Sequence, residues 1–176
     1  EACERLALLL RDQVGEPPVL VSDEHDMHDL VSILREATWL VTSRYHAAVC
    51  STAGGVPAVG VTMDERLKNL LDDRGHARLC VRVDDPDLAT RIGDALRALD
   101  ARREEVAAEV RATLPGQLEQ LGRMGLAFAA HVRARYPELP PGPATWRQAL
   151  PPLAPSIEAL LASRVTGAPA GAPACA

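Results

Sequence analysis

Short apolar runs alternate with amphipathic stretches over residues 19–99 of this chain. Four runs have the length and the composition of buried strands: 19–21, 39–41, 57–61 and 79–83. Between them apolar side chains recur at helical spacing, as in 29–36, in 65–74 and after Asp85-Pro86. This alternation predicts an α/β fold, a Rossmann-like parallel sheet with helices on both faces.

Beyond residue 100 the pattern changes to helix alone. Pro115-Gly116 predicts a restart or a kink in this part of the chain. The apolar stripe on either side of it consists of Leu114, Leu118, Leu121, Phe128 and Val132. Nine of the fourteen prolines stand at or after residue 137. We therefore expect a Rossmann-like unit with trailing helices over 1–136, and a largely irregular Pro-rich tail over 137–176 with one short helix near 157–161.

Charge and composition narrow the class of partner. With 19 basic and 24 acidic residues the net charge is −5, so no general field attracts nucleic acid. No apolar segment reaches the roughly 18 residues that a membrane span needs. The four cysteines are scattered without a Cys-x-x-Cys pair, which disfavours a zinc or dithiol site and fits a reducing compartment. We expect a cytoplasmic protein with no nucleic-acid partner, no membrane span and no metal.

Residues 42–64 carry the strongest chemical signal. Ser43 closely follows the strand at 39–41 and offers a hydroxyl at the start of a helix, with Arg44 and His46 expected in its first turn. A helix that begins at the carboxyl end of a parallel strand exposes free N–H groups and the positive end of its dipole, so it favours an anion. Arg44 and His46 would then form an anion clamp with a general acid or base. The alternative is a solvated arginine and a histidine satisfied by local hydrogen bonds.

A second group of charged side chains follows the next strand. Asp64 and Arg66 come after 57–61, and successive parallel strands end at the same edge of a sheet. This loop is therefore expected at the same edge as Ser43. Arg66 could face a phosphate with Asp64 orienting it. The alternative is that Asp64 is the N-cap of the following helix and that Arg66 belongs to a charged surface.

Other candidate sites are less specific. His25 and His28 flank Asp26 and could form half of a metal site, but no second pair of ligands is near, and a cluster at a helix start is the alternative. Cys50 and Ser51 fall within a helix and lack a nucleophile elbow. The sequence also has no Gly-x-Gly-x-x-Gly and no Walker lysine. The chemistry that remains is that of the sheet edge.

The residues of this edge stand in a recognisable order. After a strand come Ser43-Arg44-Tyr45-His46, a helix of small residues, Gly55-Val56-Pro57, a second strand and Met63-Asp64-Glu65-Arg66. This order resembles the polysaccharide pyruvyl transferase family, which characteristically shows Arg-Leu-His, an Ala-rich helix, Gly-Val-Pro and a strand ending in Tyr-Asp-x-Lys. The likeness covers roughly residues 19–99. It departs from the family at Tyr45, where the family has leucine, at Met63, where it has tyrosine, and at Arg66, which keeps only the charge of the lysine.

The resemblance implies two Rossmann-like halves similar to glycosyltransferases of the B type, with this chain as the C-terminal half and with a preceding N-terminal domain. The implied reaction joins the pyruvyl group of phosphoenolpyruvate, the donor substrate, to two hydroxyls of a carbohydrate acceptor as a ketal, without a cofactor. His46 and Arg44 would be the catalytic residues. The residues that bind substrate would be Ser43, Arg44, Tyr45, Asp64 and Arg66.

Two other functions stay open at this point. One is a glycosyltransferase of the same fold, in which Arg44 and Arg66 bind the diphosphate of a nucleotide sugar. The other is a non-catalytic domain that binds an anionic ligand or a protein partner.

Overall fold

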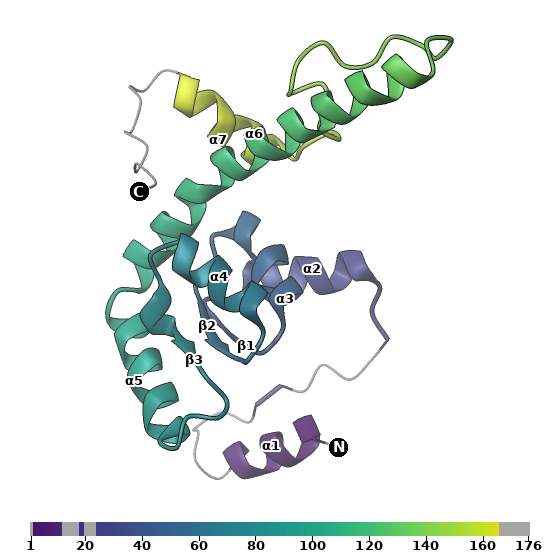
Figure 1. Cartoon of the computed structure of the whole chain (residues 1–176). Helices are drawn as coiled ribbons and strands as arrows, with labels where there is room; N and C mark the ends of the chain where they lie inside the picture. Colours follow the sequence, from purple (N-terminus) through teal and green to yellow (C-terminus); the bar gives the residue numbers. More distant parts are fainter. Residues whose placement is uncertain (1, 12–17, 20–23, 166–176) are drawn as a thin grey trace.

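A small parallel sheet forms the centre of the protein. The computed structural model describes residues 2–11, 18–19 and 24–165. Its strands β1 (Leu40–Thr42), β2 (Ala58–Val61) and β3 (Cys80–Val81) lie in that order, and both neighbouring pairs are parallel (Figure 1). The mixed α/β fold with a parallel sheet that the sequence predicts is confirmed. Most of the strand expected at 19–21 lies outside the described residues.

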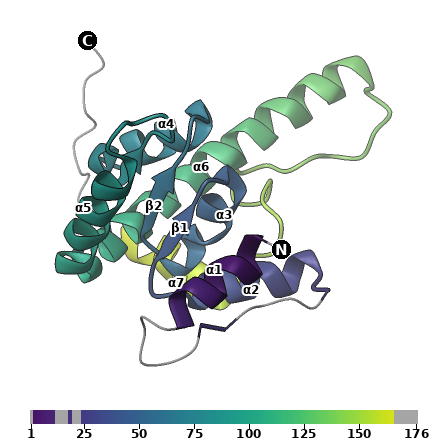
Figure 2. The ribbon, with the colours of Figure 1, turned by 90° about the horizontal axis from the view of Figure 1, so that it is seen from below.

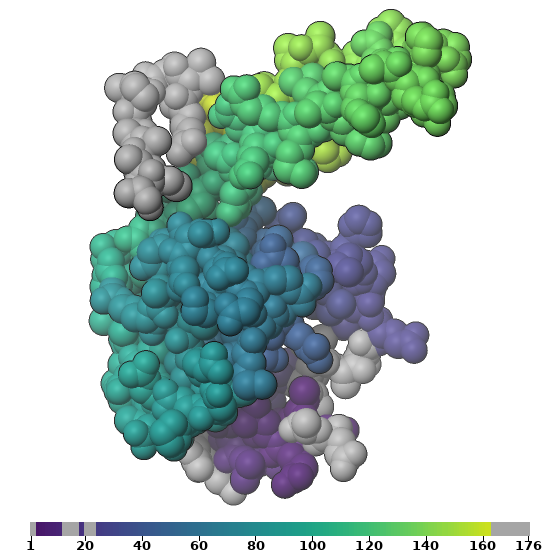
Figure 3. Space-filling model, viewed as in Figure 1, coloured from purple at the N-terminus to yellow at the C-terminus, as the bar shows by residue number. Residues whose placement is uncertain are grey.

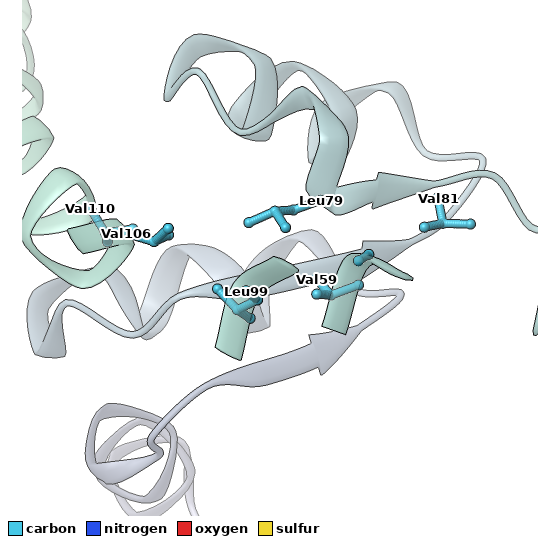
Figure 4. Close-up of a cluster of buried hydrophobic side chains, with 7 residues drawn as sticks. Val59, Leu79, Val81, Leu99, Val106 and Val110 are labelled. Atoms are coloured by element: carbon cyan, nitrogen blue, oxygen red, sulfur yellow. The ribbon is translucent and has the colours of Figure 1, made fainter. Parts of the chain in front are cut away.

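Apolar clusters cover both faces of this sheet. On one face Val59 and Val81 meet α5 (Leu88–Ala101) and α6 (Arg103–Arg135) in a buried cluster (Figure 4). The other face carries a second cluster from β2, α3 (Tyr45–Cys50) and α4 (Glu65–Asp73): Ala48, Ala58, Leu67 and Leu71. Because side chains alternate along a strand, neighbouring residues of β2 enter opposite clusters. Burial on both sides explains why β2 lies in an unbroken apolar run in the sequence.

Each connection between strands contains one α-helix and one 3₁₀ turn. A 3₁₀ turn, η1 (Thr52–Gly54), joins α3 to the segment before β2, and η2 (Ala77–Leu79) precedes β3. Gly75 follows α4 with φ +74°, the left-handed geometry expected at this helix end. β3 is shorter than the predicted 79–83, because Leu79 belongs to η2 and a turn closed by the Asp85 N–H on the Arg82 carbonyl (3.2 Å) follows the strand.

The two N-terminal helices bury little of their apolar surface against the rest of the protein. The apolar side chains of α1 (Ala2–Arg11) and α2 (Met27–Glu36) are largely exposed.

α6 is one continuous helix, so the restart expected at Pro115 does not occur. Pro115 has no N–H to donate within the helix, but it is buried, and apolar burial offsets part of that loss. Within the described ranges, no helix combines the length and the apolar content that a membrane crossing requires.

The chain after α6 turns back along it. Figures 1, 2 and 3 show α6 extending away from the sheet, with the returning segment beside it. α7 (Pro155–Val165) ends the described part of the chain, and Leu161 is buried. The tail is irregular over 137–154 apart from turns, and it has the short helix that the sequence predicts near 157–161, with wider bounds. Gly122 and Gly125 on α6 let this segment approach closely: a Cβ at Gly122 would overlap the backbone of Trp146, and one at Gly125 would lie 3.1 Å from Ala149 Cβ.

Candidate functional site

Two buried threonines position the loops at the carboxyl edge of the sheet. Thr42 ends β1, and its hydroxyl accepts a hydrogen bond from the Arg44 N–H (2.9 Å). Thr62 follows β2, and its hydroxyl accepts from the Asp64 N–H (2.8 Å). The two loops therefore turn in the same way, and α3 and α4 both start at this edge.

The start of α3 differs in one respect from the sequence-based expectation. The helix begins at Tyr45, and Arg44 is its N-cap residue, with extended backbone angles (φ −108°, ψ 122°) and without a capping bond from its side chain. His46 lies in the first turn as expected, whereas Arg44 precedes that turn. Ser43 does not cap the helix, because it lies one residue before the N-cap. The hydroxyl that organises this loop is that of Thr42.

Asp64 and Arg66 form a closed ion pair at the start of α4. Asp64 Oδ1 accepts from the Arg66 N–H (2.9 Å) and Nε (3.1 Å), and Oδ2 accepts from Nη2 (2.7 Å). Asp64 is thus the N-cap of α4, as one interpretation of the sequence predicted. The side-chain and backbone hydrogen bonds of Arg66 lower the pKa of Asp64 from its ordinary value of 3.8, and the charge of His46 lowers it further. The same pair raises the pKa of Arg66.

Tyr45 links the two helix starts. The Arg66 guanidinium carbon lies 5.5 Å from the centre of the Tyr45 ring, within the range of a cation–π contact. The Tyr45 and His46 rings meet edge to face with centroids 5.5 Å apart. The structure therefore brings together Tyr45, His46, Asp64 and Arg66. Ser43 and Arg44 lie on the adjoining loop without a side-chain contact to these four among the interactions of the described residues.

The charges at this edge are not equally balanced. Arg66 is neutralised by Asp64, whereas Arg44 is exposed and has no carboxylate partner within the described residues. His46 is also exposed, and its ring contact is with Tyr45. Arg44 stands one and two residues before the phenol of Tyr45 and the imidazole of His46. An unbalanced guanidinium can attract a small anion, and an imidazole can exchange a proton with it. Such chemistry needs no metal, and the described residues contain no group of three or more metal-ligating side chains.

The histidines near the start of α2 belong to a cluster of hydrogen bonds and charges at that helix start. Asp26 is its N-cap, and Asp26 Oδ1 accepts from the N–H groups of His28 (2.7 Å) and Asp29 (2.9 Å). His25 Nδ1 lies 3.9 Å from the Asp29 carboxylate. This is the helix-start cluster that stood as the alternative to a metal half-site.

A groove of about 930 Å³ lies beside the edge, between α3, α4, α6 and the segment that leads into α7. Tyr45 and Arg66 line one part of it, and Arg74 and Thr52 line another. Arg44 and His46 are not among its described lining residues. The groove joins segments that are distant in sequence, so the linear pattern gave no sign of it.

Sequence reasoning also missed two buried polar side chains. Arg74, at the C-terminal end of α4, is 9% exposed and donates from Nη2 to Thr52 Oγ1 (2.7 Å). His76 is 4% exposed, and its Nε2 lies 2.8 Å from Glu109 Oε2 on α6. Arg74 Nε and His76 Nδ1 are buried without a hydrogen-bond partner in the described part of the chain. In sequence Arg74 is an ordinary cation at a helix C-terminus, where it would favour the dipole from a solvated position.

Comparison with known proteins adds no further constraint. No protein-family model, curated protein or solved structure matches this chain.

Proposed function

We propose that the carboxyl edge of the sheet binds phosphoenolpyruvate, and that the chain is the C-terminal half of a pyruvyltransferase-like enzyme with a carbohydrate acceptor. The observation that carries the proposal is the charge imbalance at this edge. Arg44 has no carboxylate partner among the described residues, while the neighbouring Arg66 is neutralised by Asp64. An unpaired guanidinium two residues before an exposed histidine suits a ligand that carries both a carboxylate and a phosphate.

The proposed chemistry assigns a role to each side chain. Arg44 holds the carboxylate or the phosphate of the donor, and His46 delivers a proton to the methylene carbon of the enol. The first acceptor hydroxyl adds to the neighbouring carbon and gives its proton back to His46, and the second hydroxyl displaces the phosphate, which leaves as inorganic phosphate with the second hydroxyl proton. The Asp64–Arg66 pair holds the Tyr45 ring at the rim, where the phenol can contact the ligand. The exposed hydroxyl of Ser43 donates a further hydrogen bond to the donor substrate.

The test is a calorimetric titration with phosphoenolpyruvate. Loss of one charge-assisted contact costs about 1.5–3 kcal/mol, so Arg44→Ala should weaken binding about ten- to a hundredfold. Arg97→Ala is the matched control, because Arg97 is an exposed arginine on α5 that pairs with Asp94. That variant should bind like the parent.

A parallel titration with UDP-glucose examines the other transferase function. Binding of UDP-glucose in preference to phosphoenolpyruvate would replace the pyruvyltransferase proposal with the glycosyltransferase one. Equal affinity of Arg44→Ala and the parent for phosphoenolpyruvate would refute the assigned role of Arg44.

A further inference from the structure

The groove beside α4 combines apolar walls with a buried cation. Its apolar lining includes Leu70 of α4, Leu114 and Leu118 of α6, and Ile157 of α7. A volume of about 930 Å³ lies in the range of pockets that hold small organic ligands, commonly about 300–1,000 Å³. Pockets of this kind are mostly apolar, with a few polar groups that fix the orientation of the ligand.

Arg74 is the unusual polar group of this groove. It is about nine-tenths buried, and the hydroxyl of Thr52 accepts one of its five N–H donors. Its Nε is buried without a partner in the described residues. Burial lowers the pKa of Arg74, an effect that Tyr45 partly counteracts and that no carboxylate of the described residues opposes. Asp73 also lines the groove but forms no ion pair with Arg74 among the described residues. Burial of a cation without a counter-charge is unfavourable, and an anionic ligand would remove the penalty.

Two further basic residues line the same groove. Arg35 of α2 donates from Nε to the Cys50 carbonyl (3.3 Å). Arg66 lies eight residues before Arg74 on α4, which is about 12 Å along the helix axis. Because Asp64 already balances Arg66, the unmet positive charge lies toward the Arg74 end.

We propose that this groove binds a small amphiphilic anion. Its phosphate or carboxylate head lies at the Arg74 guanidinium, since the Thr52 hydroxyl already donates to the Ala48 carbonyl (3.0 Å). Its apolar body, on the order of ten carbons, lies along Leu70, Leu114 and Leu118.

Arg44 and His46 are not among the described residues that line this groove, whereas Tyr45 and Arg66 line both the groove and the sheet edge. The two proposed sites therefore adjoin, but each has its own anion-binding cation, Arg74 here and Arg44 there.

Dodecyl phosphate below its micellar concentration is the first probe. Calorimetry should show saturable 1:1 binding, and Arg74→Gln should weaken it at least tenfold. Arg97→Gln should leave it unchanged, because Arg97 is an exposed arginine outside the groove. Dodecanoate in place of dodecyl phosphate distinguishes a carboxylate head from a phosphate head. Dodecyltrimethylammonium, with the same chain and the opposite charge, should bind at least tenfold more weakly.

A second pair of variants tests the apolar wall with Arg74 intact. Leu118→Glu adds a negative charge to the groove and should weaken dodecyl phosphate binding at least tenfold. Met124→Glu makes the same type of change at an exposed position of α6 outside the groove and should have no effect. If circular dichroism shows that Arg74→Gln is unfolded, the comparison of Leu118→Glu with Met124→Glu tests the proposed binding in its place.

Three outcomes would overturn the proposal. These are equal affinity for the anionic and the cationic amphiphile, unchanged affinity in folded Arg74→Gln and in Leu118→Glu, or non-saturable uptake of several molecules per chain. Arg44→Ala should retain dodecyl phosphate binding, so failure here and failure of the phosphoenolpyruvate proposal are distinguishable.

Discussion

Thr42 ends β1 and Thr62 directly follows the neighbouring parallel strand β2, and each hydroxyl accepts a hydrogen bond from the N–H two residues later. The distances are 2.9 Å to Arg44 N and 2.8 Å to Asp64 N. Both threonines are at least nine-tenths buried. The common bond gives the two loops the same turn, so the helices that follow begin side by side at one edge of the sheet.

Thr62→Val should lower the free energy of unfolding by about 1–2 kcal/mol, because the isosteric side chain cannot accept the bond from Asp64 N–H. Thr62→Ser keeps the hydroxyl and should recover most of this loss. Urea unfolding followed by circular dichroism measures both variants. Equal stability of Thr62→Val and the parent would show that the bond does not hold the loop.

The Asp64–Arg66 pair should make stability depend on acid. The pKa of Asp64 in the folded state is below its ordinary 3.8, so its stabilising effect is fully present above that value and is lost as the pH falls through the folded-state pKa. Asp64→Asn can still cap α4 but lacks the charge. Urea midpoints of the parent should therefore exceed those of the variant near about pH 7, and the difference should shrink toward about pH 2.5. A difference that is constant over this range would contradict the charge argument.

His46→Ala should affect turnover more than binding. If His46 supplies the proton, phosphoenolpyruvate affinity should stay within about threefold of the parent, while phosphate release by the full-length enzyme in the presence of an acceptor should slow about a hundredfold or more. A coupled phosphate assay and calorimetry give the two numbers. Parent-like release of phosphate by His46→Ala would remove the histidine from the proposed mechanism.

Gly122→Ala should loosen the tail from α6, because the added Cβ overlaps the Trp146 backbone. Overpacking costs about 1–3 kcal/mol, so cleavage by chymotrypsin after Trp146, located by mass spectrometry, should accelerate about five- to a hundredfold.

Gly93→Ala on α5 is the control for this change. The nearest atoms to its added Cβ belong to the exposed Arg97 side chain, at 3.5 Å. It should stabilise the helix by about 0.5–1 kcal/mol and leave the cleavage rate after Trp146 unchanged. Unchanged cleavage in Gly122→Ala as well would mean that the tail does not depend on this close approach.

The parts of the structure that the sequence predicts depend on local signals. The run at 57–61 is apolar because clusters lie on both sides of β2, whereas Trp39 and Val41 in the run at 39–41 are exposed. Asp26 and Asp64 cap the helices that follow them. Ser43 shows the limit of such signals. Serine favours caps, but the neighbouring Thr42 accepts the Arg44 N–H, and the helix begins two residues after Ser43.

The groove and Arg74 could not be predicted in this way. Its walls come from residues 35–74 and 114–157, and only tertiary packing brings them together. Gly122 and Gly125, three residues apart on α6, were the local sign that backbone approaches this helix. The restart expected at Pro115 does not occur, because α6 continues through this buried proline.

The segment after α6, residues 137–165, connects two equilibria: binding of a ligand in the groove and local unfolding of this segment. Pro152, Leu153 and Ile157 form a wall of the groove, so the complete pocket exists only while this segment rests on α6. A molecule that binds the complete pocket must hold the segment in place, and by reciprocity anything that releases the segment must expel the molecule. Amide exchange in α7 would then report the concentration of the ligand, even though the cation that binds it belongs to α4.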